Sequence, residues 1–137
     1  MATIGAIRTA LQGVIDNISG LRVKDVASPA VVPPVAIIRY RGPVEFSRAT
    51  FGGDRYDEFE VTVLVPALSP ERVEAALDAY VSASGSSSIH ATIEADETLG
   101  SVVHFAQFEG WDADRDTEEY NGKEYPAAKA RVRVWHA

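Results

Sequence analysis

The sequence predicts an α+β fold: a mostly antiparallel or mixed sheet, packed by an N-terminal helix and a central helix, with a long hairpin arm. Two segments, at the start and in the middle of the chain, carry apolar residues at helical spacing. Alternating, strand-like segments lie on both sides of the central helix. The 137 residues show no internal repeat and no linker composition, so we expect one domain spanning 1–137.

The first predicted helix runs from Thr3 to Ile18, and its apolar face consists of Ile4, Ile7, Leu11, Val14, Ile15 and Ile18. Thr3 is suited to cap its start, and Gly20 to supply a left-handed stop. A short alternating piece over 21–26 follows, and three prolines then predict an extended connection. Residues 35–41 alternate and predict a strand.

The stretch from Gly42 to Asp57 has no clean period, so we interpret it as a long hairpin arm or a mobile loop. Its candidate interface residues are Arg48, Phe51 and Arg55. Long irregular connections in a compact domain are uncommon and often functional. The aromatic residues of the arm either fold back on the sheet or dock on a partner, and the sequence leaves both open.

The next strand is predicted over 58–65, with Phe59, Val61, Val63 and Val65 on one buried face and an exposed polar face opposite. Ser69-Pro70-Glu71 then predicts a helix start: a cap, a proline at the first position and an acid in the first turn. Gly85 and three serines end this helix as a linker or cap. A short helix over 88–95 and a strand over 102–108 are expected to follow.

Residues 112–125 form an acidic segment, and Asn121-Gly122 near its end is typical of a two-residue hairpin turn. Its candidate functional acids are Asp112, Asp114, Asp116, Glu118 and Glu119. They form either a solubilising hairpin tip or a functional surface, which would contact a basic patch or line a passage that repels DNA.

The last strand is predicted over 126–136 and places Lys129, Arg131, Arg133 and Trp135 on one face. One interpretation is an ordinary sheet face whose cations pair with Glu58 and Glu60 across the strands. The other is a subunit interface, because Trp and Arg are enriched at binding hot spots. We retain all four residues as candidate interface positions.

The sequence carries no signal for chemistry, so we expect no enzyme, no cofactor and no metal site. It has no cysteine, and its three histidines lie in no ligand-type spacing. The run from Asp112 resembles a calcium loop, but Thr117 and Lys123 replace the required Gly and Glu. A net charge of −7 disfavours specific nucleic-acid binding. No apolar run is long enough for a membrane span, and no secretory signal is expected.

The order of these elements resembles the tail-terminator family of phages with long, non-contractile tails. The resemblance rests on the leading helix, the proline-rich approach 29–37, the long arm, the valine-rich strand 59–65, Leu77-Asp78-Ala79-Tyr80, the Gly-Ser-Ser-Ser-Ile stretch, Thr98-Leu99-Gly100 and the final strand 130–134. It covers nearly the whole chain as a likeness of layout, without a chemical fingerprint.

The resemblance implies a homohexameric ring at the tail–neck junction of a virion, made in the host bacterial cytoplasm. Such a ring caps the completed tail tube, binds the major tail-tube protein and offers a surface to the head-side connector or stopper protein. DNA would pass through it. A neighbouring neck protein, such as a head-completion or stopper subunit, is the alternative, and a small ligand-binding or enzymatic α+β domain is a further one.

Overall fold

The computed structural model describes residues 3–25, 32–42, 55–66, 69–112, 117–120 and 122–136. Helices and strands follow one another as α1 (Ile4–Ile15), β1 (Arg22–Asp25), β2 (Val35–Gly42), β3 (Arg55–Leu64), α2 (Pro70–Val81), α3 (Ile89–Glu94), β4 (Phe105–Trp111), β5 (Thr117–Tyr120) and β6 (Lys123–His136). The predicted α+β class is therefore confirmed.

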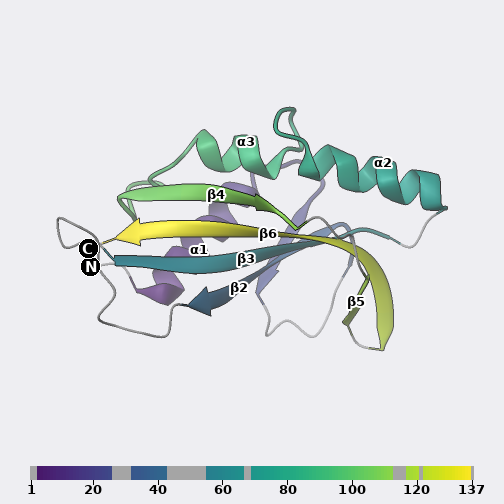
Figure 1. Cartoon of the computed structure of the whole chain (residues 1–137), viewed down its shortest axis with the longest axis horizontal. Coiled ribbons are helices and arrows are strands. Elements are labelled where there is room, and N and C mark those ends of the chain that lie inside the picture. Colours follow the sequence, from purple (N-terminus) through teal and green to yellow (C-terminus); the bar gives the residue numbers. More distant parts are fainter. Residues whose placement is uncertain are drawn as a thin grey trace.

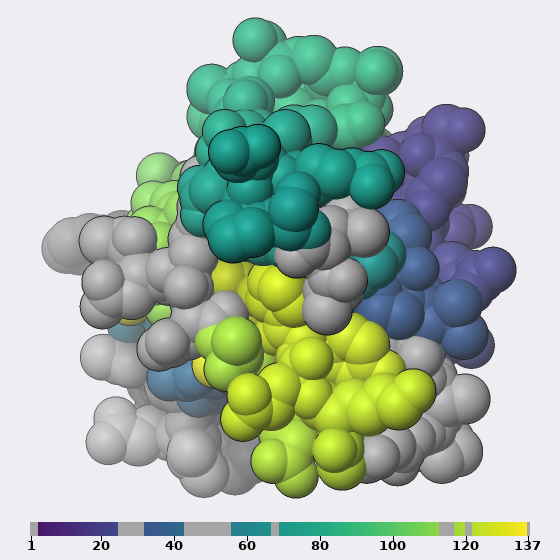
Figure 2. Space-filling model, turned by 90° about the vertical axis from the view of Figure 1, so that its right-hand side faces the viewer, coloured from purple at the N-terminus to yellow at the C-terminus, as the bar shows by residue number. Residues whose placement is uncertain are grey.

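The strands form a mixed sheet in the order β1-β2-β3-β6-β4, and β5 pairs with the start of β6. The β1–β2 pair is parallel, and every other pair is antiparallel. Strand β6 is the longest strand, and it bends away from the sheet where it pairs with β5 (Figure 1). Seen from that end, the β5–β6 hairpin forms a corner of the molecule below α2 (Figure 2).

The main core lies between one face of the sheet and the helices, with α1 packed on β2 and β1, and α3 packed on β4 (Figure 1). Helix α1 contributes Ile7, Leu11, Val14 and Ile15, as its apolar period predicts. Phe59, Val61 and Val63 of β3 are fully buried beneath the helices, also as predicted. Burying one such side chain stabilises the fold by about 1.5–3 kcal/mol.

The helix ends agree with the sequence only in part. Thr3 caps α1 by accepting a hydrogen bond from the amide of Ala6 at 3.0 Å. The helix ends at Ile15 rather than at Ile18, because residues 16–20 form a turn. Gly20, with a φ of 81°, closes this turn and does not stop the helix. Ser69 is the N-cap of α2 but makes no side-chain cap bond.

Strand β4 begins three residues later than predicted and extends to Trp111. The cause is a turn before it, in which Leu99, Gly100 and Ser101 all have positive φ angles. Val103 lies just after this turn and is buried without being part of a strand, so its apolar character was misleading. The predicted arm is shortened at its end, because residues 55–57 belong to β3, and its segment 43–54 lies outside the described residues.

Candidate functional site

The sheet face opposite α1 and α3 carries most of the charge of the strands, and we call it the charged face. Its members are Arg39, Arg41, Glu58, Glu60, Lys129, Arg131 and Arg133. At one end of this face, Val35, Ile37, Leu64 and Ala127 are buried in a small second apolar cluster. The expectation of a single buried face is therefore wrong for this end of the sheet.

Arg133 of β6 lies on the charged face between Glu58 of β3 and Glu109 of β4. Its Nη2 donates to Oε1 of Glu58, its register partner on β3, at 2.9 Å. Its Nε lies 3.0 Å from Oε1 of Glu109 on β4, without the geometry of a hydrogen bond. The bond to Glu58 raises the pKa of Arg133, and partial burial opposes this shift. The cation is thus held between two strands.

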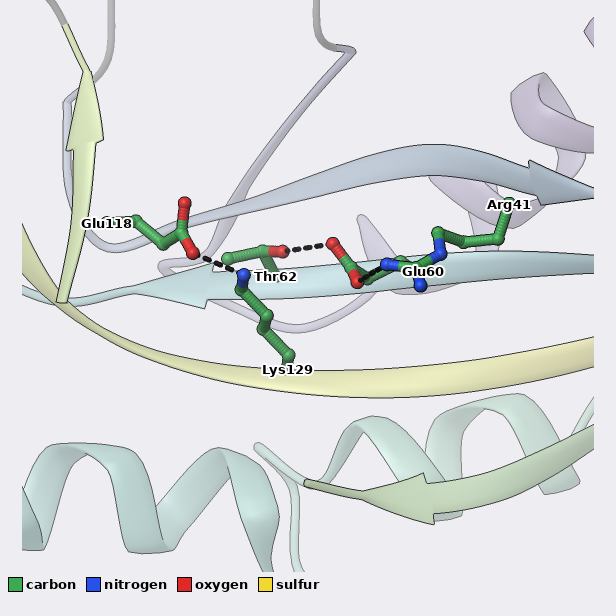
Figure 3. A network of polar contacts seen from close by, with 5 residues as sticks. All are labelled: Arg41, Glu60, Thr62, Glu118 and Lys129. Carbon is green, nitrogen blue, oxygen red and sulfur yellow. Dashed lines mark hydrogen bonds and ion pairs between the residues drawn. The ribbon is translucent and has the colours of Figure 1, made fainter. Parts of the chain in front are cut away.

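A second polar network lies further along β3 (Figure 3). Glu60 accepts a hydrogen bond from Arg41 at 2.6 Å and another from the hydroxyl of Thr62 at 3.4 Å. Lys129 pairs with Glu118 of the β5–β6 hairpin, and this bond raises the pKa of Lys129. Glu60 is only 5% exposed, so the prediction of an exposed carboxylate there is wrong. Its register partner, Arg131, does not form the ion pair that the cross-strand interpretation predicted.

An aromatic row crosses three strands beside Arg133 on the charged face. Trp135 of β6 lies between its register partners Phe105 and Tyr56, with ring centroids 5.8 and 6.2 Å away. The Arg133 guanidinium lies 4.8 Å from the Tyr56 ring and 5.8 Å from the Trp135 ring, within cation–π range. Phe105 is 40% exposed, so the row is accessible at the sheet edge.

The structure brings together only part of the predicted interface. Lys129, Arg133 and Trp135 lie on the charged face with their partners, whereas Arg131 is exposed and makes no ion pair with the described residues. Arg48 and Phe51 lie outside the described residues, and Arg55 is described only as the first residue of β3.

The predicted acidic surface is also divided. Asp112 and Glu119 are exposed, and Glu118 is held by Lys129. Asp114 and Asp116 lie outside the described residues. Tyr120 pairs with Lys123, which is the strand pairing that the predicted two-residue turn requires, and Asn121 lies outside the described residues.

A polar cluster of Tyr40, Asp57 and His136, which no sequence motif predicts, lies at the end of the helix-covered face. The Tyr40 hydroxyl donates to Oδ1 of Asp57 at 2.8 Å, and Nε2 of His136 lies 2.5 Å from Oδ2. Burial raises the pKa of Tyr40 to about 12, with a further contribution from Asp57. The phenol therefore remains protonated at neutral pH and acts as a donor that ties β2 to β3.

The other histidines and serines make local contacts. His90 is 2.7 Å from Glu94 on the same helix and stacks on Phe108 with centroids 5.0 Å apart. Ser88 is buried and caps the following helix, α3, through the amide of Ala91, whereas α2 already ends at Val81, before Gly85 and the three serines predicted to end it. Within the described ranges, no three His, Asp or Glu side chains are placed to bind a metal ion.

Comparison with protein-family models finds no match to this sequence, and a search of curated proteins finds no significant relative. Of the helices in the described part of the chain, none is long and apolar enough to cross a membrane.

Proposed function

We propose that this chain is a non-enzymatic assembly subunit that forms a hexameric ring, caps a completed phage-like tail tube and joins it to the head-side connector. Two features support the proposal: the order of elements, which resembles the tail-terminator family, and the charged face with its aromatic row. The order of elements is a feature of the sequence, whereas the charged face and its aromatic row are features of the structure.

The observation that carries the proposal is the accessible aromatic row around Arg133. Trp, Tyr and Arg are the residues most enriched at binding hot spots. Here they occupy adjacent strands, and the pairing with Glu58 and Glu109 holds the guanidinium in place. A preorganised cation–aromatic surface loses little conformational entropy on binding, so it is suited to dock on another structural protein.

The acidic β5–β6 hairpin fits the passage of DNA in this proposal. Glu119 and Asp112 are exposed, and the chain carries a net charge of −7. A lumen lined by such acids repels phosphates, so DNA passes without binding. We therefore assign these two residues to the lumen side of the ring.

The test is inhibition of tube growth. The purified chain, added to polymerising major tail-tube protein, should bind tube ends and stop their elongation. The Phe105→Ser variant should lose most of this inhibition, because it removes an exposed apolar ring from the aromatic row. Val32→Ser is the matched control, since Val32 is 52% exposed but lies outside the row.

Two results would contradict the proposal or narrow it. Unimpeded tube growth in the presence of the chain contradicts a terminator function. Binding to the portal-side adaptor without binding to the tube protein would instead indicate the neighbouring stopper function. Equal inhibition by both serine variants would show that the aromatic row is not the docking surface.

A further inference from the structure

Each edge of the sheet ends in a strand whose outer side no other described strand covers, although part of the β4 edge, at Ala106, is already bonded within the chain. Strand β4 pairs with β6 on one side, and no described strand pairs with its other side. The amide of Ala106 donates to the carbonyl oxygen of Glu97 at 2.6 Å, so it points away from β6. Alternation then directs the amide of Phe108 outward as well. At the opposite edge, β1 pairs only with β2 among the described strands.

The strand directions make these two edges compatible. Strand β1 runs parallel to β2, and three antiparallel steps lead from β2 through β3 and β6 to β4. The strands β1 and β4 therefore run in opposite directions. If the β4 edge of one copy meets the β1 edge of another copy in the same orientation, the new pair is antiparallel, the more stable arrangement.

Charge favours this pairing over pairing of like edges. Arg22 and Lys24 lie in register with Val35 and Ile37, which places both cations on the charged face at the β1 edge. Neither cation forms an ion pair with the described residues. At the β4 edge, the charged face ends in Glu109. Pairing two β1 edges would bring cations together, whereas β4 against β1 places an acid beside two cations.

The helix layer also has room at the β1 edge. A groove of about 310 Å³ lies between α1 and β1, lined by Thr9, Gln12, Gly13, Asp16 and Val23. Val23 lies on the helix-covered face of the sheet, so the groove belongs to the layer of helices. In this layer the groove lies beside β1 at one edge of the sheet, and α3 covers β4 at the other edge. Continuing the sheet across two copies would bring α3 of one copy toward this groove of the next.

We propose that the β4 edge of one copy pairs with the β1 edge of the next, so that the sheets of successive copies continue head to tail. The contact is heterologous, and such contacts generate rings when the rotation between copies closes. The proposal rests on the proposed function, because it assigns the surfaces that join subunits of the ring. The four-residue β1 ladder is short, so the groove contact supplies part of the buried area.

The test is a charge swap read by native mass. Glu109→Lys alone and the double variant Arg22→Glu/Lys24→Glu alone should each weaken association about tenfold or more. A one-to-one mixture of the two variants should regain association. When the two variants alternate around the ring, Lys at position 109 faces the two new glutamates at one contact, and the original Glu109 faces Arg22 and Lys24 at the next. Pairing of two β4 edges predicts instead that the double variant associates normally.

A steric variant keeps the test valid if charge changes disturb the fold. A Cβ at Gly13 meets nothing within 4 Å, and Gly13 lines the groove, so Gly13→Gln should place its side chain in the groove. It should weaken association, whereas Gly5→Gln, on the same helix but outside the groove, should not.

The outcomes separate the two proposals. Assembly that is unaffected by the swap and by Gly13→Gln overturns the edge pairing and leaves the proposed ring intact. A chain that stays monomeric alone and with tube protein overturns the ring and the edge pairing with it. Loss in each variant and recovery in the mixture supports both.

Discussion

Replacing Tyr40 with Phe removes one hydroxyl from the cluster with Asp57 and His136 and leaves the ring in place. The lost bond is the 2.8 Å donation to the Asp57 carboxylate. A hydrogen bond to a charged group contributes about 1.5–3 kcal/mol, so we expect the free energy of unfolding to fall by about 2 kcal/mol at pH 8. The edge-to-face contact between the Tyr40 and Phe59 rings, with centroids at 5.5 Å, should survive in the variant.

The pH dependence provides a sharper test than the size of this loss. The pKa of Tyr40 is about 12 in the folded chain, against the ordinary tyrosine value of 10.0, so between these values the folded state holds the proton more tightly. Stability therefore falls as pH rises through this window, by about 1.4 kcal/mol per pH unit. The wild type loses this contribution, and the variant has no such contribution to lose. The difference in the free energy of unfolding between the wild type and the Tyr40→Phe variant should thus narrow by about 1.4 kcal/mol by pH 11.

Urea unfolding followed by tryptophan fluorescence, at several values between pH 8 and pH 11, measures this difference. Tyr125→Phe is the control, because the Tyr125 hydroxyl makes no hydrogen bond with the described residues; we expect a change within about 0.5 kcal/mol at pH 8. A difference in the free energy of unfolding that is the same at pH 8 and pH 11 would refute the assignment of a partly buried phenol bonded to Asp57.

Two further substitutions test local parts of the structure. Ser88→Ala should lower the free energy of unfolding by about 1–2 kcal/mol, because it removes the buried cap of α3. Ser69→Ala should lower it by less, since Ser69 makes no side-chain cap bond. Thermal melts compare the two variants, and equal losses of stability would contradict the cap assignment. Arg131→Ala should weaken the inhibition of tube growth but change the free energy of unfolding by less than about 1 kcal/mol, because this cation is exposed on the charged face and makes no ion pair with the described residues. A lower melting temperature with unchanged inhibition of tube growth would show that the residue only stabilises the fold.

The elements that the sequence predicts well are those with a strong local signal. The alternation of β3, the apolar face of α1 and the pairing of Tyr120 with Lys123 each depend on neighbouring residues alone, and the described residues show all three. The start of β4 is predicted less well, because Val103 is buried just after a left-handed turn rather than within a strand, and Val102 is exposed.

The sites depend on strand register, which alternation alone does not reveal. Asp57 shares the face of Phe59, but its position beside Tyr40 and His136 follows only from how β2, β3 and β6 align. The aromatic row has the same origin, since Tyr56 and Phe105 become neighbours of Trp135 through two separate pairings. A one-residue shift would move every one of these side chains to the other face.

The most direct test of the proposed ring is the native mass of the chain, alone and after mixing with major tail-tube protein. We predict a closed homo-oligomer, with six copies expected, that binds tube ends and whose association is weakened in the Glu109→Lys variant. A chain that remains a single 14.8 kDa copy at every concentration, with tube protein present or absent, would contradict it.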